Sequence, residues 1–184
     1  AGGIGHRSTG RVPVRVGVSI GDTLAALHGV IGVLTALRHR EVNGGHGQMI
    51  DVALYESVFN VMESLLPEYD AFGAVRGPAG SALPGIAPSN AYACAGGAYV
   101  LVAGNGDSIF RRLMQAIGRE DLATDAGLAR NDGRVARVAE IDAAIQAWTS
   151  ARRIDDVIQT LEAAGVPVGR IYTVADIAAD AQYL

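Results

Sequence analysis

The sequence contains no lysine; its 15 basic residues other than histidine are all arginines. A Schiff-base enzyme needs a lysine amine, and a Walker-type phosphate loop uses a lysine to reach its phosphates. Neither kind of site can therefore be built from these 184 residues.

Cysteine is almost as scarce, with Cys94 as the single representative. One cysteine can form neither a disulfide within the chain nor a CxxC metal site. The sequence also has no HxH or HExxH pattern and no cluster of histidine with cysteine, so we predict no metal site.

Charge is sparse and nearly balanced, with 18% charged residues and a net charge of −4. This weak acidity argues against nucleic acid or an anionic membrane as a partner. Hydrophobic residues make up 49% of the sequence, which is enough for a folded core. The first 15 residues lack the apolar stretch of a secretory signal, so together with the lone cysteine they predict a cytoplasmic protein.

The longest apolar stretch runs from Val16 to Leu37 and carries one carboxylate, Asp22. We predict loop over residues 1–17, a turn of small residues, and a helix that Asp22 caps at its N-terminus. The uncharged part is shorter than the roughly 20 residues of a membrane span. Its apolar face and small-residue face therefore predict a buried helix of a soluble protein.

The remaining pattern predicts an α+β fold, in which buried helices are followed by a small domain with a short antiparallel sheet and packed helices. The predicted strands are 48–52, 90–94, 99–103 and 166–171. The predicted helices are one from residue 53 that Pro67 ends or kinks, then 108–117, 135–148, 154–164 and 174–179. We divide the chain into a partial large-domain segment with the Asp22 helix (1–72), a loop or linker (73–88) and a small α+β domain (89–184).

Two interpretations of Asp22 follow from the residues alone. As an ordinary helix cap it contributes about 1 kcal/mol, and the pattern by itself favours this interpretation. As a nucleophile, its carboxylate attacks an activated acyl carbon and splits an acyl transfer into easier steps. His28 is predicted to be a core histidine with one hydrogen bond. The turn Gly104–Asp107 fits either an anion site or a hairpin exit with a helix cap.

Five segments together resemble the class III CoA-transferases, a family that includes formyl-CoA and carnitine CoA-transferases and the α-methylacyl-CoA racemases. The resemblance covers nearly the whole chain, and it rests on the order and spacing of the segments. They are Pro13–Asp22, Gly45–Leu54, Tyr92–Ala103, Gly104–Phe110 and Ala164–Ile171.

The resemblance implies that Asp22 is the catalytic nucleophile, which passes coenzyme A from an acyl-CoA to a carboxylic acid through aspartyl anhydrides and an aspartyl thioester. It implies acyl-CoA and a carboxylic acid as small-molecule substrates, no permanently bound cofactor, and a homo-oligomer, namely a dimer. Candidate substrate-loop residues are Ser81, Pro84 and Gly85, with Asn105 in the later turn.

Two alternatives remain open at this point. Family members are considerably longer, so we expect a fragment that lacks the N-terminal half, and such a chain could be a non-catalytic module that binds acyl-CoA or a partner. A racemase-like enzyme would use Asp22 as an acid or base at the α-carbon. Racemases tend to carry Glu-Pro where this sequence has Gly106-Asp107, which favours the transferase branch.

Overall fold

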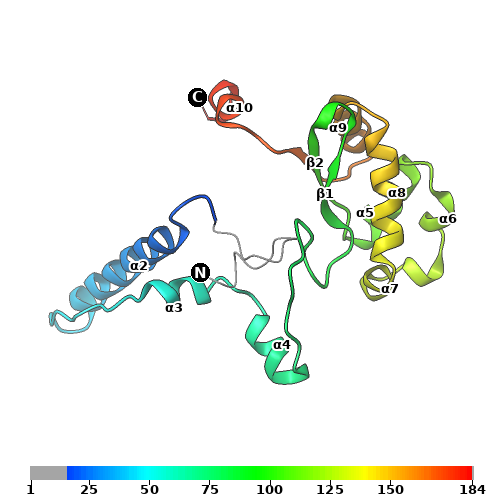
Figure 1. Ribbon diagram of the computed structural model, residues 1–184. Coiled ribbons are helices and arrows are strands. Elements are labelled where there is room, and N and C mark those ends of the chain that lie inside the picture. Colours follow the sequence, from blue (N-terminus) through cyan, green and yellow to red (C-terminus); the bar gives the residue numbers. More distant parts are fainter. Residues whose placement is uncertain (1–15, 184) are drawn as a thin grey trace. The chain divides into compact units, whose positions relative to one another are not determined.

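The computed structural model describes residues 16–183. The predicted loop over residues 1–17 therefore lies almost entirely outside the described residues. The chain forms two compact units, an N-terminal unit up to Gly80 and a C-terminal unit from Ser81 (Figure 1). That division falls within the predicted linker 73–88, and the three-part domain organisation itself stays a prediction.

From residue 16 onwards, the N-terminal unit contains the three helices α2 (Ile20–Val42), α3 (Leu54–Phe59) and α4 (Leu65–Phe72). The segment that follows α2 turns back, so that α3 packs beside the first part of α2 (Figure 1). A glycine permits this return, because a Cβ atom at Gly32 would lie 2.9 Å from the Cγ2 atom of Ile50.

The long helix differs from its prediction in two ways. It begins at Ile20, so Ser19 takes the N-cap position and Asp22 lies in the first turn instead of capping the helix. None of its residues is buried in the described part of the chain, whereas the sequence predicted a buried helix. By length and composition alone α2 could cross a membrane, which is weak evidence because core helices of soluble proteins pass the same test.

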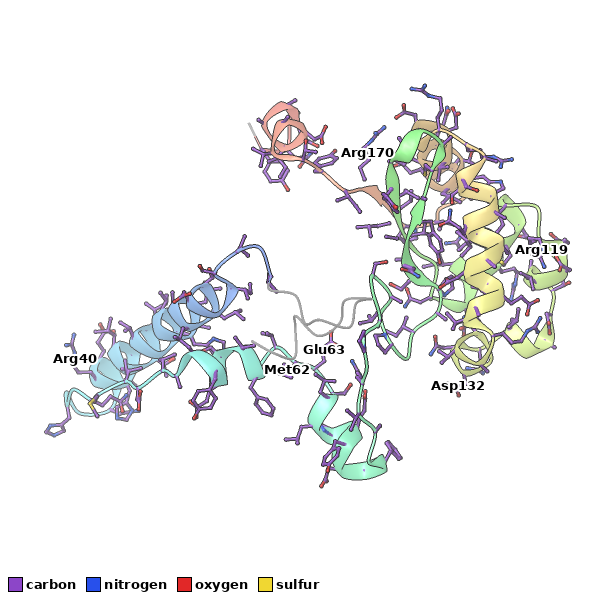
Figure 2. The ribbon with its side chains drawn as sticks, in the orientation of Figure 1. Arg40, Met62, Glu63, Arg119, Asp132 and Arg170 are labelled. Carbon is purple, nitrogen blue, oxygen red and sulfur yellow. The ribbon has the colours of Figure 1, made fainter. Side chains whose placement is uncertain are left out.

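The next segment contradicts two further predictions. Residues 48–52 form no strand, because no described segment pairs with them. The helix predicted from residue 53 is broken into α3 and α4, and Glu63 between them has a positive φ of 56° (Figure 2). Pro67 neither ends nor kinks a helix, because it lies in the first turn of α4, where its missing N–H is not needed.

The C-terminal unit is built on a three-stranded antiparallel sheet of β1 (Ser89–Ala93), β2 (Tyr99–Ala103) and β3 (Val168–Arg170). The strands lie in that order, with Leu101 opposite Ala91 on one side and Gly169 on the other. The peptide bond between Ala87 and Pro88, just before β1, is cis. The predicted hairpin and third strand are thus confirmed.

One face of this sheet is covered by helices. The hydrophobic alternation of β2 buries Val100 and Val102 and leaves Leu101 exposed on the opposite face. Leu113, Ile141, Ile145 and Leu161 complete the core from the covering helices. The helical elements of this unit are α5 (Asp107–Ala116), α6 (Glu120–Ala123), η2 (Ala126–Leu128), α7 (Asn131–Ala136), α8 (Val138–Ser150), α9 (Ile154–Ala163) and α10 (Val174–Ala179). The short helical turn η1 (Ala95–Gly97) joins β1 to β2.

The outer edge of β1 is closed by side chains. Gln146 of α8 accepts a hydrogen bond from the Ala93 N–H at 3.0 Å and donates one to the Ala93 carbonyl at 2.9 Å. The Asn90 side chain accepts from the Ala91 N–H at 2.8 Å. The α+β class with a short antiparallel sheet is confirmed, while the predicted helix 135–148 is in fact divided into α7 and α8 at Arg137.

Gly133 of α7 provides a test of this packing. A Cβ atom there would overlap the carbonyl oxygen of Gly127 in the preceding turn. Alanine normally stabilises a helix interior relative to glycine, but Gly133→Ala should destabilise the C-terminal unit by about 1–3 kcal/mol through overpacking. Urea unfolding followed by the fluorescence of Trp148, the single tryptophan, measures this change.

The matched control is Gly169→Ala, because a Cβ atom at Gly169 meets nothing within 4 Å. Equal unfolding midpoints for the two alanine variants would contradict the close packing of α7 on the preceding turn.

Candidate functional site

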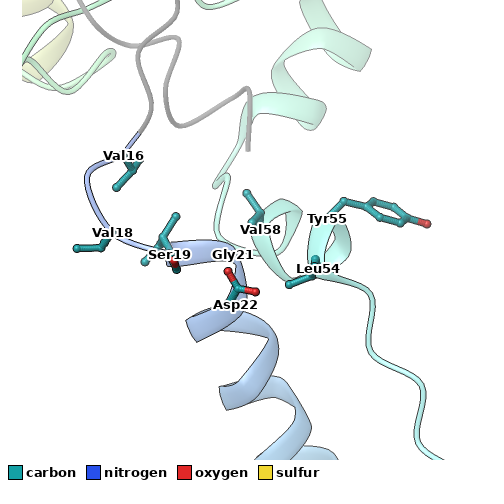
Figure 3. A pocket seen from close by; sticks show the side chains of 9 residues that line it. Val16, Val18, Ser19, Gly21, Asp22, Leu54, Tyr55 and Val58 are labelled. Carbon is teal, nitrogen blue, oxygen red and sulfur yellow. The ribbon is translucent and has the colours of Figure 1, made fainter.

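The Asp22 carboxylate lies beside a cavity of about 320 Å³ in the N-terminal unit. The cavity is formed by the segment that leads into α2, the first turn of α2 and part of α3 (Figure 3). Its lining is mostly apolar, with Ser19, Tyr55 and Asp22 as polar exceptions. The lining residues are Val16, Val18, Ser19, Ile20, Gly21, Asp22, Leu54, Tyr55 and Val58.

Asp22 is the only ionisable carboxylate among these lining residues. Its side chain is exposed and makes no hydrogen bond or ion pair within residues 16–183. The first turn of a helix carries partial positive charge, which stabilises a carboxylate there. An unpaired carboxylate at an open cavity with apolar walls is suited to attack an electrophilic carbon.

His28 lies further along α2 and is engaged at both ring nitrogens. Its Nδ1 atom lies 2.7 Å from the Leu24 carbonyl oxygen, and Asn60 Nδ2 lies 3.0 Å from its Nε2 atom. Because the carbonyl can only accept and the amide NH₂ can only donate, the proton is assigned to Nδ1. The sequence predicted a core histidine with one hydrogen bond, whereas His28 is half-buried on a helix without buried residues and makes two hydrogen bonds. It therefore has no free nitrogen to serve Asp22 as a base.

The turn before Asp22 also has the spacing Gly-x-Ser-x-Gly, with Ser19 at its centre. Such a serine is a nucleophile when it lies on a sharp turn between a strand and a helix and has a histidine partner. Here residues 16–18 form no strand, and Ser19 is the N-cap of α2. Its carbonyl oxygen accepts from the Thr23 N–H at 3.1 Å, so Ser19 starts the helix and lacks the setting of a hydrolase nucleophile.

The four predicted substrate-loop residues all lie in the C-terminal unit. The Ser81 hydroxyl donates to Asn90 Oδ1 at 2.5 Å, and the Asn105 carbonyl accepts from Arg134 Nη2 at 2.8 Å. Pro84 is half-buried, and Gly85 has a φ of 81° in an exposed turn. Ser81 borders a second cavity of about 370 Å³ at one end of the sheet, which Pro84, Gly85 and Asn105 do not line.

A polar network between β1 and α8 was not predicted from the sequence. Asp142 of α8 accepts hydrogen bonds from the Tyr92 hydroxyl at 2.6 Å and from Asn90 Nδ2 at 3.1 Å. Burial, and then the neighbouring Asp142 carboxylate, raise the pKa of Tyr92 above its usual value. The partners lie about 50 residues apart in sequence, so no local pattern indicates the network.

Neither a reactive cysteine nor a metal-binding cluster is found in the described part of the chain. Cys94 is buried in the core of the C-terminal unit, and burial raises the pKa of its thiol, which disfavours the reactive thiolate. Within residues 16–183, no three His, Cys, Asp or Glu side chains are grouped so that they could hold a metal ion.

The sequence matches CoA-transferase family III over residues 2–184. It is 42% identical over 174 residues to the succinyl-CoA–D-citramalate CoA-transferase of Chloroflexus aurantiacus, and the match covers 95% of this chain and 43% of that protein. It is 32% identical to the formyl-CoA:oxalate CoA-transferase of Streptomyces avermitilis, over 92% of this chain and 45% of that enzyme. The chain thus spans less than half the length of these relatives.

Solved structures give a consistent picture of the fold. A CaiB/BaiF family protein from Brucella suis superimposes with a TM-score of 0.73 at 35% identity, over 98% of this chain and 48% of that one. Rv3272 from Mycobacterium tuberculosis gives a TM-score of 0.78 at 22% identity, over 94% of this chain and 44% of that one.

The polar network predicts an alkaline limit to stability. Because the folded pKa of Tyr92 is raised, the phenol stays protonated in the folded protein while the unfolded chain loses this proton above about pH 10. The unfolded state then binds fewer protons, so the free energy of unfolding falls as pH rises beyond that point. Tyr92→Phe should lower stability by about 1 kcal/mol at neutral pH and should flatten this alkaline decline.

Urea unfolding between pH 8 and pH 11, followed by Trp148 fluorescence, checks both effects. Tyr99→Phe is the matched control, because the Tyr99 side chain is 53% exposed on the neighbouring strand. If the free energy of unfolding of Tyr92→Phe fell as steeply above pH 10 as that of the wild type, Tyr92 would not be the cause of the decline.

Proposed function

Because the chain belongs to CoA-transferase family III, we propose that it carries the catalytic nucleophile, Asp22, of an enzyme that moves coenzyme A between an acyl-CoA and a carboxylic acid. One observation carries the proposal: the Asp22 carboxylate lies unpaired at the start of α2, beside a cavity with apolar walls. The two relatives described above are both named as CoA-transferases, which supports this chemistry.

The proposed reaction begins when an Asp22 oxygen attacks the carbonyl carbon of the acyl-CoA thioester. A mixed anhydride forms and the CoA thiolate leaves. The thiolate then attacks the aspartyl carbonyl, which gives an aspartyl-CoA thioester and releases the donor acid. The acceptor carboxylate attacks this thioester to form a second anhydride, and the returning thiolate attacks the acceptor carbonyl. The CoA thioester of the acceptor acid leaves as the product, and the Asp22 carboxylate is restored.

The surroundings of Asp22 suit two demands of this sequence. The helix start stabilises the carboxylate before the attack and after its release. The anhydrides are hydrolysed by water, and the apolar side chains of Leu54 and Val58 offer no hydrogen bonds to water on their side of the cavity. A carboxylate alone suffices for these steps, which fits the engagement of both His28 nitrogens elsewhere.

We propose succinyl-CoA as the first donor to test, since it appears in the names of several relatives. Ser81, Pro84, Gly85 and Asn105 are proposed to contact the substrates. No permanently bound cofactor enters the scheme, and a cytoplasmic location fits the acyl-CoA substrate.

We propose that α2 packs against protein in a homo-oligomer, and that it binds neither lipid nor nucleic acid. Its exposed apolar side chains form an extended surface of a kind that rarely stays bare. They are Leu27, Val30, Ile31, Val33, Leu34, Leu37 and Val42, each at least 38% exposed. The subunit composition of one relative, the malate CoA-transferase with its α and β subunits, is compatible with oligomer formation.

Trapping tests the nucleophile. Hydroxylamine converts an aspartyl thioester or anhydride into a hydroxamate, so succinyl-CoA and hydroxylamine should label Asp22 in the 184-residue chain. Asp22→Asn should reduce the labelling by at least ~10³-fold, because the variant lacks the attacking carboxylate. Peptide mass spectrometry locates and quantifies the adduct.

Asp70→Asn is the matched control, because Asp70 is an exposed acid on α4 outside the cavity lining. Labelling at another residue, with the Asp22→Asn variant as reactive as the wild type, would refute the assignment.

Sedimentation velocity over a range of concentrations tests the oligomer. The chain should associate, and Ile31→Glu with Leu34→Glu should shift it towards monomer, because both side chains are 61% exposed on α2. Val174→Glu, which replaces an 82% exposed valine of α10, is the control. A wild-type chain that remains monomeric at high concentration would contradict the proposal.

A further inference from the structure

Helix α7 lies between two loops that carry predicted substrate-contacting residues. The first loop is residues 84–88, which include Pro84 and Gly85, and the second is residues 104–107, which include Asn105. Asn131 and Arg134 lie three residues apart on α7, and this spacing places them on one face of the helix. Between them, these two side chains bind both loops.

Asn131 holds the first loop by its backbone. Its Oδ1 atom accepts a hydrogen bond from the Ala87 N–H at 3.1 Å, and its Nδ2 atom donates to the Gly85 carbonyl at 2.8 Å. The side-chain amide therefore pairs with a donor and an acceptor two residues apart, which fixes the turn between them. The positive φ of Gly85 belongs to this turn.

Arg134 joins the first loop to the second. Its side chain is fully buried, and its Nε atom donates to the Ala87 carbonyl at 3.0 Å. Its Nη2 atom donates to the Asn105 carbonyl and to Asp107 Oδ1, both at 2.8 Å. Ala87 and Asn105 are thus held by a single rigid, planar group.

The remaining donors of Arg134 are also used. Nη1 donates to the carbonyls of Leu128 and Ala129 at 3.1 and 3.3 Å, and the guanidinium carbon lies 5.1 Å from the centre of the Phe110 ring. All five N–H groups therefore have an acceptor. Replacing a buried ion pair by hydrophobic side chains of similar volume often leaves a protein equally stable. The five hydrogen bonds of Arg134 therefore point to a role in fixing the geometry of the bonded loops.

We propose that Asn131 and Arg134 are positioning residues, which preset the loops 84–88 and 104–107 as one substrate-contacting surface. The inference rests on the proposed function in one respect, namely that these loops contact acyl-CoA or the acceptor acid. In this proposal both side chains act through the two loops and take no part in the bond-forming steps. Their backbone bonds leave the Asn105 side chain and the exposed turn at Gly85 free to meet a ligand.

We call the hydrogen bonds from Asn131 and Arg134 to the two loops the clamp. Amide hydrogen exchange in the 184-residue chain tests whether these bonds hold the loops. Asn131→Ala should speed exchange of the Ala87 N–H at least tenfold, because that N–H loses its acceptor. Asn131→Asp retains an acceptor for Ala87, so its Ala87 exchange should stay close to that of the wild type. Asp132→Asn is the control, since Asp132 lies exposed on α7 and makes no hydrogen bond or ion pair in the described chain (Figure 2). Unchanged exchange in Asn131→Ala would overturn the clamp.

Kinetics with succinyl-CoA test the positioning role. Arg134→Lys keeps the charge but loses the planar fork, so it and Asn131→Ala should raise KM about tenfold. Hydroxamate formation on Asp22 at saturating succinyl-CoA should stay within twofold of the wild type. Faster loop exchange with an unchanged KM would overturn the positioning role. If Arg134→Lys fails to fold, as judged by Trp148 fluorescence, the Asn131 variants alone decide the outcome.

A separate measurement distinguishes failure of this inference from failure of the proposed function. If the wild-type chain never labels Asp22, the proposed function fails. The clamp is then judged by whether succinyl-CoA slows amide exchange in the two loops of the wild type and less so in Asn131→Ala. Protection that is equal in both chains, or absent from the loops, would overturn the inference.

Discussion

The buried guanidinium of Arg134 is the interaction on which the arrangement of the loops in the C-terminal unit depends. It connects the segment before β1, the turn after β2 and the turn before α7 through five hydrogen bonds. Burying a cation is costly unless each donor is satisfied and a counter-charge lies near, and here Asp107 supplies that charge. The bonding set therefore fixes the relative positions of segments that the sheet alone does not hold.

Much of the C-terminal unit follows from local sequence signals. Gly118 and Gly165 have positive φ angles and end α5 and α9 where the sequence predicted. The helix predicted over residues 174–179 has the predicted bounds, and Thr173 with Asp176 forms a capping box at its start. These features depend on residues only a few positions apart, which is why pattern and composition suffice to predict them.

The N-terminal unit was harder to predict because its features depend on distant partners. Residues 48–52 alternate as a strand does, but a strand needs a neighbour, and none pairs with them in the described chain. At the candidate site the sequence and the resemblance selected Asp22, yet they placed it as a cap because the first turn of α2 could not be located to within two residues. The Arg134 bonds and the network at Asp142 link residues far apart in sequence, which no periodicity reveals.

The side-chain hydrogen bonds along the β1 edge affect whether a second copy of the chain can add a strand to this sheet. A strand at the margin of a sheet normally offers a template on which another chain can add its own backbone. Gln146 occupies that template at Ala93 with one side-chain amide, which acts as a single peptide unit of an additional strand. The Ala91 N–H and the Ser89 carbonyl are likewise engaged, by Asn90 and by the Leu83 N–H. Growth of this sheet into an aggregate by templating at β1 would first have to displace these groups, so α8 protects the hairpin as well as packing on it.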